Sequence, residues 1–248
     1  MPLSSNTLIH FTEKKDALKG ILADNFHVKY CKESIHFGEN SNLIIHVPMV
    51  CFCDIPLSQI KNHIANYGHY GIGLTREWAI KNKLNPVLYV QHDSSLAISY
   101  DQLIKDILKA SKKINDKDVF KRTMDIARYL KNYEGKPERS GKVIKKKYRF
   151  SDEREWRYVP PYSSACKVLY THQTYTKPGI VEEAIQSMEG YRLKFNPNDV
   201  KYIIIKNDKE IGEFIEHLRL AKGKKYSQNI IERLTTRLFT SDQIHKDI

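Results

Sequence analysis

The stretch Tyr148–Val159, Tyr-Arg-Phe-Ser-Asp-Glu-Arg-Glu-Trp-Arg-Tyr-Val, is the part of the sequence that most constrains the fold. Its second half is rich in aromatic residues and follows a Ser-Asp turn, which predicts a β-strand from Glu153 onward. Because side chains alternate across a strand, Glu153 and Glu155 are expected to share one face. Two like charges on one face of a central strand are costly unless that face meets a cleft, a cation or a polar ligand. The pattern therefore indicates a functional site.

The alternative is an edge strand whose glutamates face water. In that case they would pair with neighbouring cations, for which the sequence offers Arg154, Arg157 and Lys146. Solvated charge runs of this kind are common on protein surfaces.

Length and composition favour one elaborated domain, spanning residues 1–248, with a polyanionic partner. Of the 248 residues 41% are hydrophobic, enough for a core. The 41 lysines and arginines outnumber 29 acidic residues and give a formal charge of +12, which favours nucleic acid as a partner. We expect a cytoplasmic protein, because no apolar run reaches the length of a membrane span and the N-terminus lacks a signal-peptide pattern.

The four cysteines are too few and too irregularly spaced for the disulfide framework of a secreted module. Cys51 and Cys53, with His46 and His63 nearby, do not form the two separated pairs of a closed zinc site. The sequence therefore predicts buried, reduced thiols and no metal.

A second candidate site lies in the strand-like run Leu8–Thr12, where alternation places His10 and Thr12 on one face. Residues 13–22 have helical spacing, with Thr12 as the expected N-cap. A strand that delivers His and Thr to a helix N-terminus forms a donor-rich corner suited to ribose and phosphate oxygens. The alternative is an ordinary core or surface histidine.

A third candidate is the segment 67–74, Tyr-Gly-His-Tyr-Gly-Ile-Gly-Leu. Gly68 is expected to end the preceding helix, and the two later glycines would let a backbone or a ligand approach the next strand. An aromatic ring beside bare backbone suits a flat ligand ring, so Tyr67 and Tyr70 are candidate contacts. A glycine-rich bend with packed tyrosines is the alternative.

The remaining periodicity predicts mainly peripheral elements. Thr75 is expected to cap a helix over 76–83, and a capping box at Ser99 and Gln102 is expected to open a helical insertion at about 99–134. Strands are predicted over 191–195 and 200–205, and helices over 208–220 and 226–238.

A cationic cluster leads directly into the glutamate stretch; it comprises Lys142, Lys145, Lys146, Lys147 and Arg149. A nucleic-acid phosphate backbone could dock there, with Tyr148 and Phe150 available for base stacking. Charge balance beside the glutamates is the alternative.

Two family resemblances follow from these segments. Phe150–Arg157 is similar to the signature strand of bacterial proteins related to the ADP-ribosyltransferases. The strings Val47–Ser58, Tyr67–Leu74 and Asn85–Val90, together with Glu77-Trp78, resemble the AbiGi family of abortive phage-resistance proteins. With the flanking strands the AbiGi resemblance covers most of residues 8–160. Labels in that family point to an antitoxin or a defence-system component.

The resemblance to ADP-ribosyltransferases implies an α+β fold, with a split β-sheet core around an NAD cleft and peripheral helices. The protein would then be a mono-ADP-ribosyltransferase that moves ADP-ribose from NAD to a nucleic-acid or protein acceptor. The resemblance places His10 and Thr12 at a ribose and Tyr67 or Tyr70 on nicotinamide. It implies that Glu155 stabilises the oxocarbenium-like charge as nicotinamide leaves and that Glu153 orients the acceptor or acts as its base. The two glutamates could exchange these roles.

The other hypothesis is a non-enzymatic member of a two-gene defence system. Its cleft would be vestigial, and its basic surface would bind a partner toxin, RNA or operator DNA. Because one fold can carry many functions, the family name does not decide between the two hypotheses. Convergence of His10, a tyrosine of 67–70 and Glu155 on one cleft would favour the enzyme.

Overall fold

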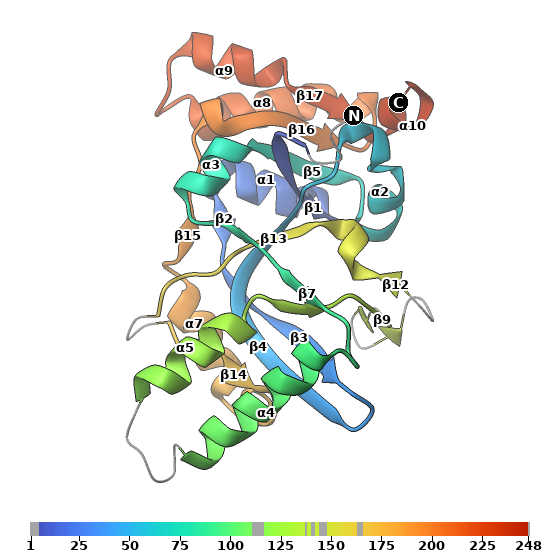
Figure 1. The fold of residues 1–248 in the computed structure, drawn as a ribbon. Coiled ribbons are helices and arrows are strands. Elements are labelled where there is room, and N and C mark those ends of the chain that lie inside the picture. The colour runs from blue at the N-terminus through green and yellow to red at the C-terminus, as the bar shows by residue number, and fades with distance from the viewer. Residues whose placement is uncertain are drawn as a thin grey trace. The chain divides into compact units, whose positions relative to one another are not determined.

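The structure is a computed structural model, in which residues 5–110, 117–136, 138–139, 142–143, 148–162 and 166–247 are described. The chain divides into two compact units. The first unit comprises Met1–His27, Cys51–Leu84 and Tyr191–Ile248, and the second comprises Val28–Val50 and Asn85–Gly190. Both combine strands and helices, so the α+β class is confirmed (Figure 1). The single domain and the ADP-ribosyltransferase-like core stay predictions.

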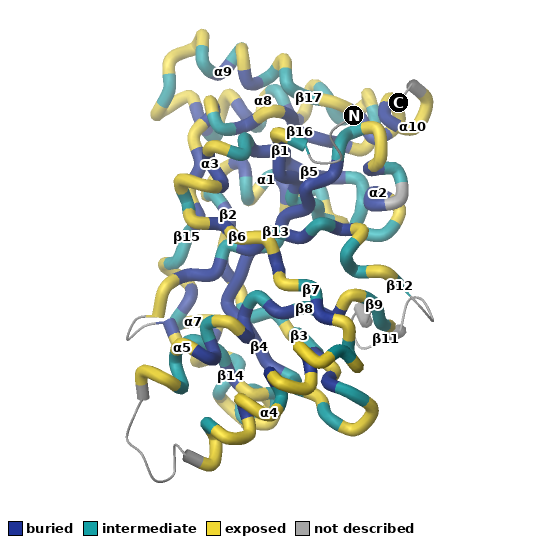
Figure 2. Tube along the Cα trace, viewed as in Figure 1, coloured by how far each residue is buried: buried dark blue, intermediate teal, exposed yellow. Residues whose placement is uncertain are grey.

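The first unit is built on a mixed sheet whose strands follow the order β17, β16, β5, β1. Strand β1 (Thr7–Thr12) is antiparallel to β5 (Tyr70–Thr75), with Thr12 opposite Tyr70. The end of β4 (Ser41–Cys53) pairs with β1, β16 (Val200–Ile205) is antiparallel to β5, and β17 (Leu238–Thr240) is parallel to β16. These strands are largely buried because they carry aliphatic residues toward both faces (Figure 2).

Helices cover both faces of this sheet. On the face of Tyr70 lie α1 (Lys15–Asp24) and α8 (Ile211–Lys222), whose Phe214 stacks on Tyr70 at 6.5 Å. The opposite face packs Ile9 and Tyr202 against Ile60, Ile64 and Ile244. Ile60 directly follows η1 (Leu57–Gln59), Ile64 lies in α2 (Lys61–Tyr67) and Ile244 lies in α10 (Ser241–Asp247). The unit also contains β2 (Phe26–His27), α3 (Arg76–Lys81), β15 (Arg192–Leu193), η3 (Pro197–Asp199), η4 (Asp208–Glu210) and α9 (Gln228–Thr235).

The second unit is organised around a long hairpin. Strand β3 (Lys29–Phe37) is antiparallel to β4, from Lys29 opposite Met49 to Phe37 opposite Ser41, and Gly38 supplies the left-handed turn residue with φ 63°. Strand β7 (Leu88–Val90) is parallel to β8 (Leu130–Asn132), and β13 (Glu155–Tyr158) pairs with β6 (Asn85–Pro86). The helices are α4 (Ser95–Ala110), α5 (Lys117–Ala127), α6 (His172–Tyr175) and α7 (Ile180–Met188). Short segments complete the unit: β9 (Glu134–Gly135), β10 (Glu138–Arg139), β11 (Lys142–Val143), β12 (Tyr148–Arg149), η2 (Phe150–Glu153) and β14 (Tyr170–Thr171).

Several local predictions are confirmed. Thr75 caps α3 by accepting a hydrogen bond from the Trp78 amide at 3.1 Å, Gly68 ends α2 with φ 105°, and β16 has the predicted bounds. The predicted cap at Thr12 is wrong, because α1 begins two residues later, after Lys14. The capping box at Ser99 is also wrong: α4 begins at Ser95, and the Ser94 hydroxyl accepts from the Ala97 amide. Both errors shift a helix start by a few residues, the usual uncertainty of a sequence-based boundary.

Candidate functional site

The two candidate catalytic glutamates lie in the second unit, but not on one continuous strand. Glu153 ends the 3-10 helix η2, Arg154 has the left-handed angles φ 44° and ψ 53°, and β13 begins at Glu155. The expected strand start at Glu153 is therefore wrong. Glu153 and Glu155 are 6% and 5% exposed, so they do not face water as the edge-strand alternative expects, but the pairing with Arg157 that this alternative names is present for Glu155.

Glu155 is held by two cations. One carboxylate oxygen, Oε1, accepts a hydrogen bond from Arg157 Nε at 2.7 Å. The other, Oε2, lies 2.8 Å from Lys131 Nζ and 3.4 Å from Arg157 Nη2. Arg157 is fully buried and also donates to the Glu33 carboxylate at 2.8 Å and to the Arg128 carbonyl at 2.8 Å. Both oxygens of Glu155 are thus engaged within the unit.

Lys131 joins these groups to Glu153. Its ammonium lies 3.9 Å from Glu153 Oε2 and 3.9 Å from Glu33 Oε1, and it sits over the Phe150 ring at 5.1 Å. We call Glu33, Lys131, Glu153, Glu155 and Arg157 the buried charge cluster. Glu153, Glu155 and Arg157 are buried, and the side chains of Glu33 and Lys131 are partly exposed. The cluster contains three carboxylates and two cations, drawn from β3, β8, η2 and β13.

The cluster holds its groups in their charged forms. Burial alone would raise the pKa of Glu155, but the Arg157 and Lys131 cations hold that pKa well below its usual value. Burial would likewise lower the pKa of Lys131, yet Glu155 and Glu33 raise it well above its usual value. An ionised carboxylate with both oxygens occupied is a fixed anion, poorly suited to transfer a proton.

Two tyrosines lie beside glutamates of the cluster. The Tyr89 hydroxyl accepts a hydrogen bond from the Glu155 amide at 2.8 Å, and burial raises its pKa. Burial and the neighbouring Glu153 raise the pKa of Tyr148. The sequence predicted Arg157 as a partner of Glu155, because residues two apart on a strand lie on the same face. No local pattern pointed to Lys131 or Glu33.

His10 lies in the first unit with its ring between aromatic side chains. Its Nδ1 donates to the Cys51 carbonyl at 2.8 Å, and the ring centroids of Phe26 and Phe52 are 5.3 and 5.7 Å away. Burial lowers the pKa of His10 despite the hydrogen bond to Cys51. The imidazole is therefore neutral at pH 7, with Nε2 left as an acceptor.

The other candidate ligand contacts of the first unit separate onto two faces. Residues directly opposite in an antiparallel pair share a face, so Tyr70 lies on the side of Thr12 and His10, where its hydroxyl donates to Glu210 at 3.0 Å. Tyr67 instead stacks on His63 at 5.1 Å, and His63 contacts Phe11, which points to the opposite face. The first unit thus places Tyr70, but not Tyr67, on the face of His10.

The glycines of this segment serve side-chain packing. A Cβ atom on Gly73 would lie 2.4 Å from Cε2 of Tyr202, and one on Gly71 would lie 3.1 Å from Cδ1 of Phe11. The bare backbone is covered by aromatic rings of the protein itself, as the packing alternative expects, although the ring over Gly73 comes from β16. His10, Thr12, Tyr67 and Tyr70 belong to the first unit and both glutamates to the second, so their convergence on one cleft stays a prediction.

The cationic cluster is described only in part. Arg149 is exposed, 3.9 Å from Asp152 and 5.9 Å from the Tyr133 ring, and Lys142 lies in β11. Lys145, Lys146 and Lys147 lie outside the described residues. The Tyr148 and Phe150 rings pack edge to face at 5.5 Å.

The two histidines near Cys51 and Cys53 in the sequence, His46 and His63, have partners other than a metal ion. His46 Nε2 lies 3.1 Å from His172 Nδ1, and His63 is stacked on Tyr67. Across the described ranges, no group of three or more His, Cys, Asp or Glu residues could hold a metal ion. Among the same residues, no helix is long and apolar enough to cross a membrane.

Comparison with known proteins gives two matches. The family described as "Putative abortive phage resistance protein AbiGi, antitoxin" matches residues 24–206. The chain is also 27% identical over 227 residues to the abortive phage resistance protein AbiGi of Lactococcus lactis subsp. cremoris, covering 82% of this chain and 89% of that protein. No solved structure has significant similarity to the chain.

Proposed function

Because the chain belongs to the AbiGi family of abortive phage-resistance proteins, we propose that it is the antitoxin of a two-gene phage-defence system. In this role it binds the toxin protein encoded beside it and keeps that toxin inactive until infection. The family description names an antitoxin, and a non-enzymatic protein acts through its surface. The proposal requires no NAD and no reaction at the glutamates.

The observation that carries this proposal is the state of Glu155. Its two carboxylate oxygens are occupied by Arg157 and Lys131, at 2.7 and 2.8 Å, inside the second unit. A glutamate that stabilises developing charge on a substrate must have an oxygen directed at that substrate. Glu155 instead neutralises Arg157 and Lys131 within its own unit, which is a structural task.

Co-expression tests the antitoxin proposal. The neighbouring toxin gene alone should arrest growth of a bacterial host, and induction of this chain should restore growth while forming a complex of defined stoichiometry. The matched control is a chain with a stop codon early in the reading frame. Growth arrest that persists in the presence of the soluble, folded chain would contradict the antitoxin proposal.

The transferase remains the second candidate, supported by one feature of the cluster. Two buried carboxylates, Glu153 and Glu155, lie within 3.9 Å of the same ammonium, a paired arrangement that can divide charge stabilisation and acceptor activation. In this hypothesis NAD is the substrate, with His10, Thr12 and Tyr70 or Tyr67 as its contacts. The acceptor would be nucleic acid or protein.

Labelled NAD distinguishes the two functions. A transferase should transfer label to an acceptor in phage-infected lysate, and Glu155→Gln should abolish transfer in a variant that still melts cooperatively. An antitoxin should transfer no label, and the same variant should lose thermal stability, because Gln cannot compensate Arg157 and Lys131. Thermal melting of Glu155→Gln beside wild type measures the structural role of Glu155 under either function, and label transfer alone distinguishes the two.

Nucleic-acid binding is compatible with either function. The formal charge of +12 and the exposed Arg149 at the C-terminal end of the cationic cluster support it. Salt-dependent binding of single-stranded RNA or DNA is the measurement that tests it.

A further inference from the structure

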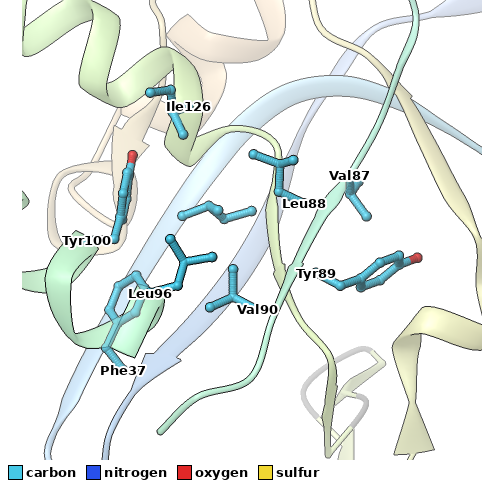
Figure 3. Close-up of a pocket in the computed structure, with 9 residues that line it drawn as sticks. Phe37, Val87, Leu88, Tyr89, Val90, Leu96, Tyr100 and Ile126 are labelled. Atoms are coloured by element: carbon cyan, nitrogen blue, oxygen red, sulfur yellow. The ribbon is translucent and has the colours of Figure 1, made fainter. Parts of the chain in front are cut away.

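The second unit has an apolar pocket that lies outside the buried charge cluster. Its volume is about 280 Å³, and its lining is aliphatic and aromatic (Figure 3). Five of its lining residues are buried: Phe37, Val87, Val90, Tyr100 and Leu130. The pocket is contributed by β3, β7, β8, α4 and α5.

Large aliphatic side chains at the pocket are left in water. Leu88 is 50% exposed, Leu96 is 62% exposed and Ile126 is 46% exposed, and all three line the pocket. Leu103, 44% exposed, follows Leu96 by seven residues on α4, which is about two helical turns or roughly 10 Å. Single exposed hydrophobic residues are common, but a group of them around one pocket is typical of an interaction site.

The polar groups at the pocket are already satisfied within the unit. The Tyr100 hydroxyl donates to the Thr123 carbonyl at 2.6 Å, and the Leu88 amide donates to the Tyr129 carbonyl at 2.8 Å. The Val90 carbonyl accepts from the Tyr133 amide at 2.9 Å. A small-molecule site normally offers a few convergent polar groups that orient the ligand. These groups are committed elsewhere, which favours a partner that needs only apolar anchors.

The charges on the neighbouring helices point to the same kind of partner. On α4, Lys105 pairs with Asp101 at 2.5 Å and Gln102 donates to Asp106 at 2.8 Å. At the end of α5, Arg128 pairs with Asp125. These paired charges do not require an oppositely charged ligand, so apolar contacts are expected to dominate recognition at the pocket.

We propose that this pocket is the docking site for an amphipathic helix of the partner toxin, a proposal that rests on the antitoxin function. Apolar side chains at helical spacing on the toxin enter the pocket and contact the Leu96 and Leu103 side of α4. Helix-in-groove recognition uses anchors at i, i+3 or i+4, and i+7, which matches the two-turn length of the apolar stripe. The buried charge cluster then keeps the second unit folded and does not contact the toxin.

Glutamate substitutions test the pocket. Leu96→Glu and Ile126→Glu place a charge at its mouth, and each should weaken toxin affinity by about 30-fold or more, the range of an interface hot spot. The matched control is Ile185→Glu on α7, which makes the same change at an aliphatic residue of the same unit that is 65% exposed. The replaced side chains are largely in water, and thermal melting checks folding. Leu96→Gln is a milder second variant that keeps the test valid if a glutamate disturbs α4.

Calorimetry with the purified toxin and growth rescue in the host are the readouts. Weakened binding and lost rescue in the pocket variants, with Ile185→Glu unchanged, support the site. Equal affinity in all variants overturns the site and leaves the antitoxin function standing. A wild-type chain that neither binds nor neutralises the toxin overturns both proposals. Native mass spectrometry and light scattering cover other occupants: a bound small apolar molecule, or a self-association that the pocket variants disrupt, overturns the toxin helix.

Discussion

The two units distribute apolar and charged side chains in opposite ways. Among the described residues, the first unit exposes three large hydrophobic side chains, Ile80, Leu220 and Phe239. The second unit exposes Leu88, Leu96, Ile98, Leu103, Leu108, Val119, Ile126, Tyr133, Tyr162 and Ile185. It also buries the charged residues Arg128, Glu153, Glu155 and Arg157, against Asp54 and Lys222 in the first unit.

Both features of the second unit carry an energetic cost. Removing charges from water costs several kcal/mol per ion before their mutual attraction offsets it, and exposed aliphatic groups forgo the gain of burial. A surface selected for binding and an interior held by ion pairs are therefore expected to make the second unit the more easily disrupted one. Each unit contains one tryptophan, Trp78 in the first and Trp156 in the second, so Trp→Phe variants that keep one or the other report the units separately.

Arg157→Met is expected to have the largest effect. It removes the fully buried guanidinium but leaves Glu155 and Glu33 without their shorter ion pairs, which should lower the free energy of unfolding by about 3–5 kcal/mol. Urea unfolding followed through Trp156 should show the loss. The control Asp54→Asn in the first unit keeps an oxygen for the Ser5 amide and should cost less. An equal shift at both tryptophans would mean that the units unfold together.

The sequence located this part of the second unit but not its arrangement. The turn signal at Ser151 and Asp152 and the aromatic residues after Glu155 were sufficient to find β13. The left-handed Arg154 was not foreseeable, because a residue other than glycine enters that region only when surrounding structure compensates. Lys131 and Glu33 lie 22 or more residues from Glu153 along the chain, so only the tertiary fold brings them together. Local pattern cannot report such a pairing.

A pH titration should first weaken both units over the same range, because each contains a histidine whose pKa is lowered. Burial lowers the pKa of His63 in the first unit to about 4, and burial with His172 lowers that of His46 in the second unit to about 4. A depressed folded-state pKa gives stability that is present above the unfolded value, near 6.5, and is lost as pH falls toward 4. Both units should therefore weaken across that window, by up to about 1.4 kcal/mol per pH unit for each histidine.

Glu155 adds a further loss in the second unit alone. Its pKa lies well below the unfolded value of about 4.3, so its contribution is complete above that pH and falls as the solution becomes more acidic. Unfolding measured through Trp156 should steepen below about pH 4 by more than the signal of Trp78, because the carboxylates of the first unit with a lowered pKa, Asp24 and Glu213, lie on the surface, where solvent screens their ion pairs. Glu155→Gln should remove the difference. Parallel acid curves for the two tryptophans in wild type would contradict this account.

Gly73→Ala tests the close approach of the Tyr202 ring to β5 in the first unit. Its new Cβ would meet the Tyr202 ring at 2.4 Å, so the sheet or the ring must move, at a cost of about 1–3 kcal/mol. Gly212→Ala on α8 is the control, because nothing lies within 4 Å of its Cβ position and alanine favours a helix by up to about 1 kcal/mol. The sequence identified Gly73 as a site of close approach, but the approaching ring comes from a strand more than 120 residues later. A neutral Gly73→Ala, measured through Trp78, would show that the Tyr202 contact relaxes freely.

The smallest expected change in stability comes from the cationic segment, where the measurement is binding. Replacing Lys145, Lys146 and Lys147 by alanine should alter the free energy of unfolding by no more than about 0.5 kcal/mol, because lysines in a charge run are rarely buried in folded proteins. If the second unit binds single-stranded RNA or DNA there, wild-type affinity should fall by nearly one power of salt concentration for each phosphate neutralised, and the triple variant should show weaker binding and a flatter slope.

A matched variant of the first unit, Lys201→Ala with Lys206→Ala and Lys209→Ala, keeps the same net charge. Equal slopes in both triple variants would mean that binding follows the overall charge of +12 rather than this segment. Binding that is absent or insensitive to salt would leave the second unit with its apolar pocket as the stronger candidate for partner recognition.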